Sequence, residues 1–189
     1  MAKPVKIAHI LFMTRQFEEM IQWYQSVFEA EVVQQTPALS FLAFDDENHR
    51  FGIANLSVLK ETSPTAAAMG EIGINHVAFT YASIGDLLET HARLNEADIH
   101  PYWAIHHGMT VSLYYLDPNR NRMELQVDSC STKEAIEYMT SEAFAANPVG
   151  VDIAPDQLLA QFRAGVSAEE LLAMPDGPMS AIPVEHGVT

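Results

Sequence analysis

The sequence predicts an α+β fold in which two βαβββ modules pair and a helical C-terminal extension follows them. The first observation is an internal repeat: residues 7–12 resemble residues 74–79, and both hexamers carry a histidine at their third position. β-Branched and aromatic residues make each hexamer a strand candidate. Behind each hexamer, at residues 17–28 and 84–94, apolar side chains recur at the i, i+3, i+4, i+7 spacing of an amphipathic helix.

Three short strand candidates follow each of these helices. They cover residues 31–36, 39–44 and 51–56 in the first copy and residues 102–105, 109–116 and 122–127 in the second. Polar turns at 45–48 and 117–121 precede the last strand of each copy. Because a helix on an open sheet leaves one sheet face uncovered, the modules, 6–60 and 72–128, are expected to pair into one domain over residues 1–128 that encloses a cavity.

Residues after 128 repeat no part of the two modules. Helices are expected over 133–145, over 156–164 and directly after the capping-box pattern at 167–170. We therefore expect a helical extension over 129–175, which either covers a sheet edge or meets a partner subunit. Pro and Gly are frequent near the end of the chain, so a loose tail is expected over 176–189.

Composition places the chain among globular proteins, with 48% apolar and 19% charged residues. A net charge of −15, with ten scattered Lys and Arg residues, argues against nucleic-acid binding, because that binding depends on cations that contact phosphates. No apolar run approaches the ~20 residues of a membrane span, and we find no export signal. Cys130 is the single cysteine, which excludes an internal disulfide and fits a reducing cytosol. A cytoplasmic enzyme without membrane or nucleic-acid partners is expected.

Three residues are candidate ligands of one metal ion. His9 and His76 occupy the same position in the first strand of each copy, and Glu124 lies on the polar face of the second copy's last strand. Two imidazoles and one carboxylate are the facial set of non-haem Fe(II) oxygenases, which leaves positions open for substrates. The matching strand of the first copy, 51–56, offers neither imidazole nor carboxylate, which favours an open site. The alternative is that the histidines are hydrogen-bonded core residues.

The paired modules, the two strand histidines and the segment 114–125 together resemble the vicinal oxygen chelate superfamily. Within it, residues 6–128 resemble the single-domain type I extradiol dioxygenases, which cleave dihydroxybiphenyl and catechol rings. The resemblance implies Fe(II), with Mn(II) as the alternative, held by His9, His76 and Glu124. It also implies a catechol-type aromatic diol and dioxygen as substrates, with both oxygen atoms added as the ring opens beside the diol. A homo-oligomer is expected.

The resemblance further implies three catalytic residues. Tyr114, ten residues before the glutamate, and His107, in a His-Gly turn, are expected to donate hydrogen bonds to the substrate oxygens. His106 is the alternative to His107 if the loop shifts. His49, at the start of the first copy's last strand, is expected to act as general base and acid, unless it is a solvent histidine beside an acidic turn.

The remaining histidines are expected to have structural places. We expect His91 to pack on its helix, and His100 and His186 to lie at the surface. Arg120 stands where the family usually has a turn glycine, and Asn119 and Asn121 beside it can supply left-handed backbone geometry.

Two other functions stay open at this point. An isomerase or lyase of the glyoxalase type binds a divalent ion without redox change, although such relatives usually need a fourth protein ligand. A binding protein that sequesters an aromatic compound has no use for two matched histidines and a glutamate. Dioxygen uptake with a catechol after Fe(II) loading distinguishes these functions from ring cleavage.

Overall fold

The computed structural model describes residues 2–28, 30–60, 72–116 and 122–188. The chain divides into two compact units. Unit 1 comprises Met1–Ile7 and Ala78–Ala181, and unit 2 comprises Ala8–Val77 and Ile182–Thr189. The expected turn at 117–121, which includes Arg120, lies outside the described residues.

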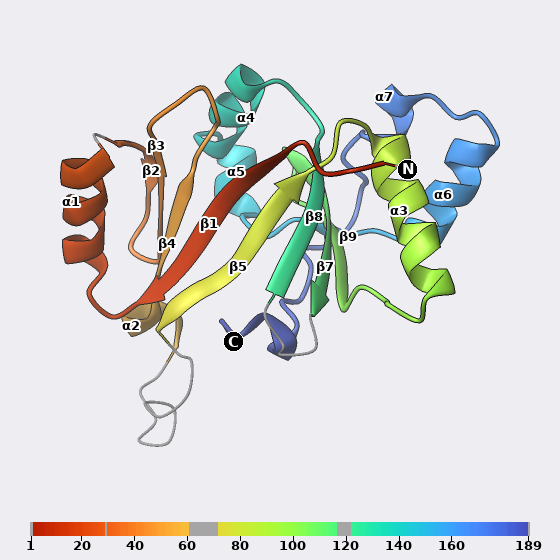
Figure 1. Cartoon of the computed structure of the whole chain (residues 1–189). Helices are drawn as coiled ribbons and strands as arrows, with labels where there is room; N and C mark the ends of the chain where they lie inside the picture. The colour runs from red at the N-terminus through yellow and green to blue at the C-terminus, as the bar shows by residue number, and fades with distance from the viewer. Residues whose placement is uncertain (1, 29, 61–71, 117–121, 189) are drawn as a thin grey trace. The chain divides into compact units, whose positions relative to one another are not determined.

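Unit 2 contains the first βαβββ module (Figure 1). Its elements are most of β1 (Lys6–Thr14), α1 (Phe17–Phe28), β2 (Glu31–Gln35), β3 (Leu39–Ala43), β4 (Phe51–Asn55), α2 (Leu56–Leu59) and the first part of β5 (Gly73–Thr80). The strand order is β2-β3-β4-β1-β5, with β1 parallel to β4 and with antiparallel β2–β3 and β3–β4 pairs. Phe17, Ile21 and Tyr24 on one face of α1 pack against Leu42 and Ile53 of the sheet, which explains the helical spacing in the sequence.

Unit 1 contains the second module. After the end of β5 come α3 (Ile84–Glu96), β6 (Trp103–His106), β7 (Thr110–Leu116) and β8 (Arg122–Asp128). The strand order in this unit is β5-β8-β7-β6-β9, and the β6–β7 and β7–β8 pairs are antiparallel. Leu87 and Leu88 of α3 pack with Val111 and Leu113 of β7, so the same helix-on-sheet packing recurs in the second copy.

The C-terminal extension folds onto the second module within unit 1. It forms α4 (Thr132–Met139), α5 (Glu142–Ala146), β9 (Val151–Asp152), α6 (Pro155–Arg163) and α7 (Ala168–Leu171). β9 pairs antiparallel with β6, with Ile105 opposite Asp152 and His106 opposite Val151. Leu171 of α7 joins the core beneath α3. Of the two roles considered for the extension, covering a sheet edge is the one present within this unit.

One predicted helix is wrong in its length. The helix expected over 133–145 is divided into α4 and α5. The division has a local cause, because the Thr140 hydroxyl donates to the carbonyls of Ile136 and Glu137 at 3.2 and 3.0 Å. The Ser141 hydroxyl then accepts from the Phe144 amide at 3.2 Å and caps a new helix.

The segment 176–189, which we expected to be loose, makes specific contacts in both units. In unit 1 the Ser180 amide donates to the Gly150 carbonyl at 2.8 Å, and Ser180 is buried. In unit 2 a 3₁₀ turn at Val184–His186 receives a hydrogen bond of 2.9 Å from the Asn75 amide to the His186 carbonyl. Pro and Gly in this segment therefore do not prevent order, because the polar groups beside them find partners in the folded chain.

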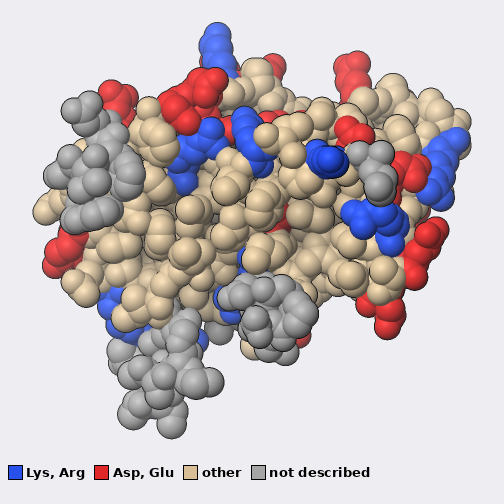
Figure 2. Space-filling model, in the orientation of Figure 1, with Lys and Arg blue, Asp and Glu red and all other residues tan. Residues whose placement is uncertain are grey.

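Two surface properties concern the partners of the chain. Among the described residues, the helices are all too short or too polar to cross a bilayer. On the face shown in Figure 2, Lys and Arg side chains are scattered among Asp and Glu side chains.

Candidate metal centre

His9 and His76 face each other in unit 2. His9 lies in β1 and His76 in β5, and their Nε2 atoms are 3.1 Å apart. The two rings are nearly perpendicular, with centroids 5.3 Å apart. Two neutral imidazole nitrogens at this distance either share one proton or direct two lone pairs at a common cation.

Asn75 determines which nitrogen of His76 carries the proton. The Asn75 side-chain nitrogen donates to the His186 carbonyl at 2.9 Å, and a carbonyl can only accept, so the orientation of the amide is defined. The Asn75 Oδ1 atom is then the acceptor for His76 Nδ1, 2.8 Å away. A neutral His76 therefore presents a lone pair at Nε2, which is the state that a metal ligand requires.

His49 lies against His9 in the same unit. The two rings are stacked with centroids 4.6 Å apart, and the centroid of the Phe41 ring lies 4.8 Å from that of His49. His49 is 7% exposed, so the alternative of a solvent histidine is wrong: the ring is buried and contacts two other rings. Its Nδ1 atom lies 2.5 Å from Asn48 Oδ1, which leaves Nε2 of the neutral ring as a proton acceptor.

Arg50 fixes the turn that carries His49. Its Nε atom donates to the Asp45 carboxylate at 2.9 Å, and its Nη1 atom donates to the Ala8 carbonyl at 2.8 Å. Ala8 directly precedes His9, so one guanidinium connects the turn of His49 with the strand of His9. The acidic turn of the sequence thus has a structural role as the partner of Arg50.

Glu124 and Tyr114 form the polar centre of unit 1. They lie opposite each other on β8 and β7, and Glu124 is 1% exposed. As strand alternation predicts, Leu125 and Val127 pack with the core beneath α3, whereas Glu124 belongs to the other face. Burial raises the pKa of Tyr114 well above its ordinary value, and the charge of Glu124 and a hydrogen bond to it raise that pKa further. The Tyr114 hydroxyl is therefore a neutral hydrogen-bond donor near neutral pH.

His107 is the histidine of the His-Gly turn that contacts Tyr114. Its Nε2 atom lies 3.0 Å from the Tyr114 hydroxyl, and its Nδ1 atom donates to the Val149 carbonyl at 2.5 Å. Both ring nitrogens of the alternative residue, His106, have other hydrogen-bond partners. Its Nε2 atom donates to the Leu172 carbonyl at 3.0 Å, and its Nδ1 atom accepts from the Gly108 amide at 2.9 Å.

The other histidines were predicted with mixed success. His91 is 2% exposed on α3 and its Nε2 lies 2.9 Å from Asp156, so its expected packing is confirmed. His100 has a side chain that is 58% exposed, as expected. The expected surface position of His186 is wrong, because its ring is buried beside His76, with the two ring centroids 5.5 Å apart.

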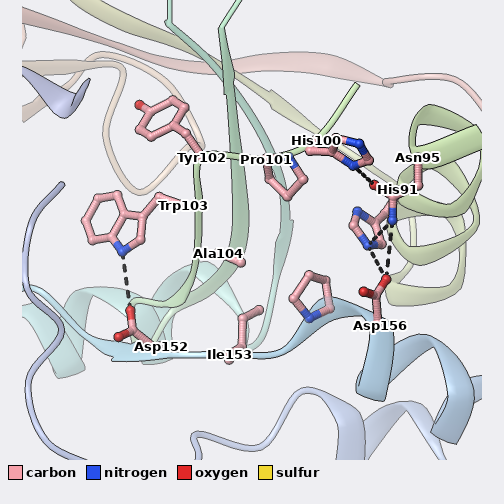
Figure 3. A pocket seen from close by; sticks show the side chains of 11 residues that line it. His91, Asn95, His100, Pro101, Tyr102, Trp103, Ala104, Asp152, Ile153 and Asp156 are labelled. Carbon is pink, nitrogen blue, oxygen red and sulfur yellow. Dashed lines mark hydrogen bonds and ion pairs between the residues drawn. The ribbon is translucent and has the colours of Figure 1, made fainter. Parts of the chain in front are cut away.

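A cleft of about 550 Å³ opens within unit 1 between α3, β6, β9 and α6 (Figure 3). Tyr102 and Trp103 line one end, with Asp152 beside the Trp103 indole nitrogen, and His91 and Asp156 line the other.

The sequence reasoning overlooked two asparagines. Asn48 and Asn75 directly precede His49 and His76, and in both pairs the asparagine Oδ1 is the partner of the next histidine's Nδ1. The signal that was available is the Asn-His dipeptide itself, which occurs at both positions. Because the two residues adjoin in the chain, this pairing needs little tertiary information.

Residues 6–125 match the family model described as the Glyoxalase/Bleomycin resistance protein/Dioxygenase superfamily. The chain belongs to this superfamily. A biphenyl-2,3-diol 1,2-dioxygenase 2 of Rhodococcus globerulus is 38% identical over 168 residues, which cover 88% of this chain and 86% of that protein. Biphenyl-2,3-diol 1,2-dioxygenase 3 of the same organism is 36% identical over 170 residues, with the same coverage.

A solved structure, the Mn(II)-bound glyoxalase from Novosphingobium aromaticivorans, matches with a TM-score of 0.53 and 23% identity. The match covers 66% of this chain and only 38% of that one, so it supports the fold alone. Together these comparisons confirm the expected superfamily and fold class. They also confirm the expected relationship to dioxygenases that act on dihydroxybiphenyl.

Proposed function

We propose that this chain is an extradiol dioxygenase that cleaves a catechol-type aromatic diol at a metal ion held by His9, His76 and Glu124. The observation that carries the proposal is the pair of Nε2 atoms 3.1 Å apart, with the tautomer of His76 set by Asn75. Relatives at 38% and 36% identity over most of the chain carry dioxygenase names, which supports the reaction class.

The residues fit a divalent metal ion by their chemistry. Two ring nitrogens and one carboxylate oxygen are the donors that His9, His76 and Glu124 offer. A carboxylate that is 1% exposed, such as Glu124, is costly to bury unless a cation or hydrogen bonds compensate its charge. Fe(II) is the ion that we propose, with Mn(II) as the alternative. When bound, such an ion lowers the pKa of a coordinated diol hydroxyl and transfers electrons between diol and dioxygen.

The other three residues act on the diol and its protons. His49 accepts a proton from a diol hydroxyl at Nε2 and returns it as the ring opens, because Asn48 occupies Nδ1. Tyr114 donates a hydrogen bond to a substrate oxygen, and its raised pKa keeps the hydroxyl protonated. His107 donates from Nε2 when its ring is protonated, since its Nδ1 proton is already bound to the Val149 carbonyl.

The test is dioxygen uptake by the Fe(II)-loaded protein under reducing conditions with biphenyl-2,3-diol. We expect consumption of one O₂ per diol and a product whose mass equals the diol plus two oxygen atoms. A diol with its hydroxyls in a 1,3 arrangement is the matched control, because it cannot chelate one ion through both oxygens. Absence of uptake, together with isomerisation activity under nitrogen, would instead identify an enzyme of the glyoxalase type.

Two further expectations from the sequence remain predictions. We expect a homo-oligomer, which sedimentation of the purified protein measures, and a cytoplasmic location, which fractionation of the source cells measures. The pairing of residues 1–128 into one catalytic domain is likewise a prediction. Loss of metal binding on separate expression of 6–60 and 72–128, with recovery on mixing, is the expected result.

A further inference from the structure

The C-terminal extension holds the β6–β7 hairpin, which carries His107 and Tyr114. The backbone carbonyl of Val149 accepts the Nδ1 proton of His107, and β9 pairs with β6 next to it. The Ser129 hydroxyl donates to the Gly108 carbonyl in the hairpin turn at 3.0 Å. Each of these contacts comes from a residue beyond the repeated modules.

A second set of contacts reaches Tyr114 through Trp103. The Trp103 and Tyr114 rings are stacked, with centroids 5.2 Å apart and planes 25° from parallel. The Trp103 indole nitrogen donates to the Ser180 hydroxyl at 3.0 Å, and that hydroxyl donates in turn to the Asp152 carboxylate. Figure 3 shows the Trp103 ring with its nitrogen directed at Asp152. Trp103, Tyr114 and Ser180 are each at most 7% exposed.

Glycines at two positions allow close approaches between these segments. Gly150 has φ +119°, and a Cβ there would lie 2.3 Å from the His106 carbonyl oxygen of β6. A Cβ at Gly177 would lie 2.6 Å from a methyl carbon of Val151 in β9. Gly150 therefore lets the chain before β9 approach the backbone of β6, and Gly177 lets the segment that leads to Ser180 approach the Val151 side chain of β9. A larger side chain at either glycine would disturb these contacts.

We propose that the extension, together with the segment after it as far as Ser180, is part of the active site, and that Ser180 is a positioning residue that orients Tyr114 through Trp103. The inference rests on the proposed function, since it assigns Tyr114 and His107 to substrate binding. The physical reason is that stacking alone leaves an indole free to rotate in its plane. A hydrogen bond at Nε1, itself held by Asp152, removes that freedom and fixes the surface against which the Tyr114 ring packs.

The central variant is Ser180→Ala in the Fe(II)-loaded protein. We expect kcat for the diol to fall about tenfold while KM changes less than about twofold, because the diol still binds but a hydrogen-bond donor is misoriented. The matched control is Ser167→Ala, which removes the hydroxyl that caps α7 and accepts from the Glu170 amide at 3.2 Å. This control loses a serine hydrogen bond elsewhere in the C-terminal part of unit 1, and we expect its kcat to be unchanged.

A double variant tests whether the effect passes through Trp103. Trp103→Phe keeps an aromatic ring for stacking but removes the N–H that Ser180 accepts. If Ser180 acts through this bond, adding Ser180→Ala to Trp103→Phe causes no further loss of kcat. If the kcat of the double variant instead falls by the product of the two single losses, Ser180 does not act on Tyr114 through the Trp103 N–H, and the inference is overturned.

Hydrogen–deuterium exchange supplies a readout that does not depend on activity. We expect Ser180→Ala to accelerate amide exchange in a peptide covering 103–114 several-fold, and Ser167→Ala to accelerate it only near 167–172. Unchanged exchange in 103–114 would overturn the inference whatever the kinetics show. A wild-type protein that consumes no dioxygen would overturn the proposed function, and the exchange comparison would still decide whether Ser180 holds the hairpin.

Discussion

The Nε2 atoms of His9 and His76 lie 3.1 Å apart, although 67 residues separate the two histidines in the chain. Asn75 accepts from His76 Nδ1 at 2.8 Å and thereby assigns the proton of the His76 ring. A lone pair of His76 is consequently directed toward His9. This lone pair is the one that the proposed metal ion would use.

Asn75→Ala is expected to weaken metal binding by about 10- to 100-fold, because His76 loses the acceptor that orients its ring. Competition with a chelator of known affinity measures the change. Asn55→Ala is the matched control in the same unit: it removes a side chain that caps α2 by accepting from the Ser57 amide at 3.0 Å. Equal metal affinities in the two variants would contradict the prediction.

Glu124→Ala and Tyr114→Phe are expected to differ in their metal content. The first removes a proposed ligand and should lose the metal, whereas the second keeps the metal and lowers kcat by about 10²- to 10³-fold, because only a hydrogen-bond donor is lost. Metal analysis of the purified variants beside their dioxygen uptake distinguishes the two. Glu137→Ala, at a side chain that is 65% exposed, is the control for loss of a carboxylate. Equal iron contents in the first two variants would count against the assignment.

The free energy of unfolding is expected to decrease as the pH falls below neutral, because of His106. Burial lowers the pKa of His106, and the hydrogen bond to the Leu172 carbonyl only partly opposes that effect. Below the ordinary histidine pKa of about 6.5, the unfolded chain binds a proton at this ring and the folded chain does not. The neutral His106 ring therefore makes its full contribution to the free energy of unfolding above a pH of about 6.5. That contribution is lost as the pH falls toward the lowered pKa of His106.

Urea unfolding at a series of pH values from about 8 to 5 measures this dependence. We expect His106→Gln to be less stable at neutral pH and to lose less stability on acidification than the wild type. His100→Gln is the control, since the His100 side chain is 58% exposed. An identical pH dependence in wild type and His106→Gln would show that another group is responsible.

Gly108→Ala and Gly165→Ala separate backbone strain from crowding. The two glycines have nearly the same φ, +89° and +88°, but a Cβ at Gly108 would lie 2.3 Å from the Tyr138 ring, whereas Gly165 has no atom within 4 Å. We expect Gly165→Ala to cost about 1–2 kcal/mol of strain. Gly108→Ala should cost about 1–3 kcal/mol more and also lower kcat, because the turn carries His107. Thermal unfolding of both variants checks the difference, and equal losses would contradict it.

Much of the fold and the candidate ligands could be predicted from the sequence. The repeat, the helical spacing behind each copy and the alternation around Glu124 are regularities of neighbouring residues. They identified β1, β5 and β8 with their polar positions, because a strand or helix exposes one face to the core at a fixed period. The same reasoning failed at Thr140, where a side chain that bonds to its own helix ends α4 early.

Other features depend on partners far away in the chain. His107 rather than His106 contacts Tyr114 because the Val149 carbonyl, 42 residues further on, holds its other nitrogen. Asn75 is oriented by His186, 111 residues away, and Trp103 is held by Ser180, 77 residues away. Periodicity carries no information about such contacts, since a hydroxyl or carbonyl becomes a partner only after packing has brought it within reach. The sequence by itself therefore determined the two modules and the candidate ligands, whereas only the tertiary structure decided which distant groups hold Asn75, His107 and Trp103 in place.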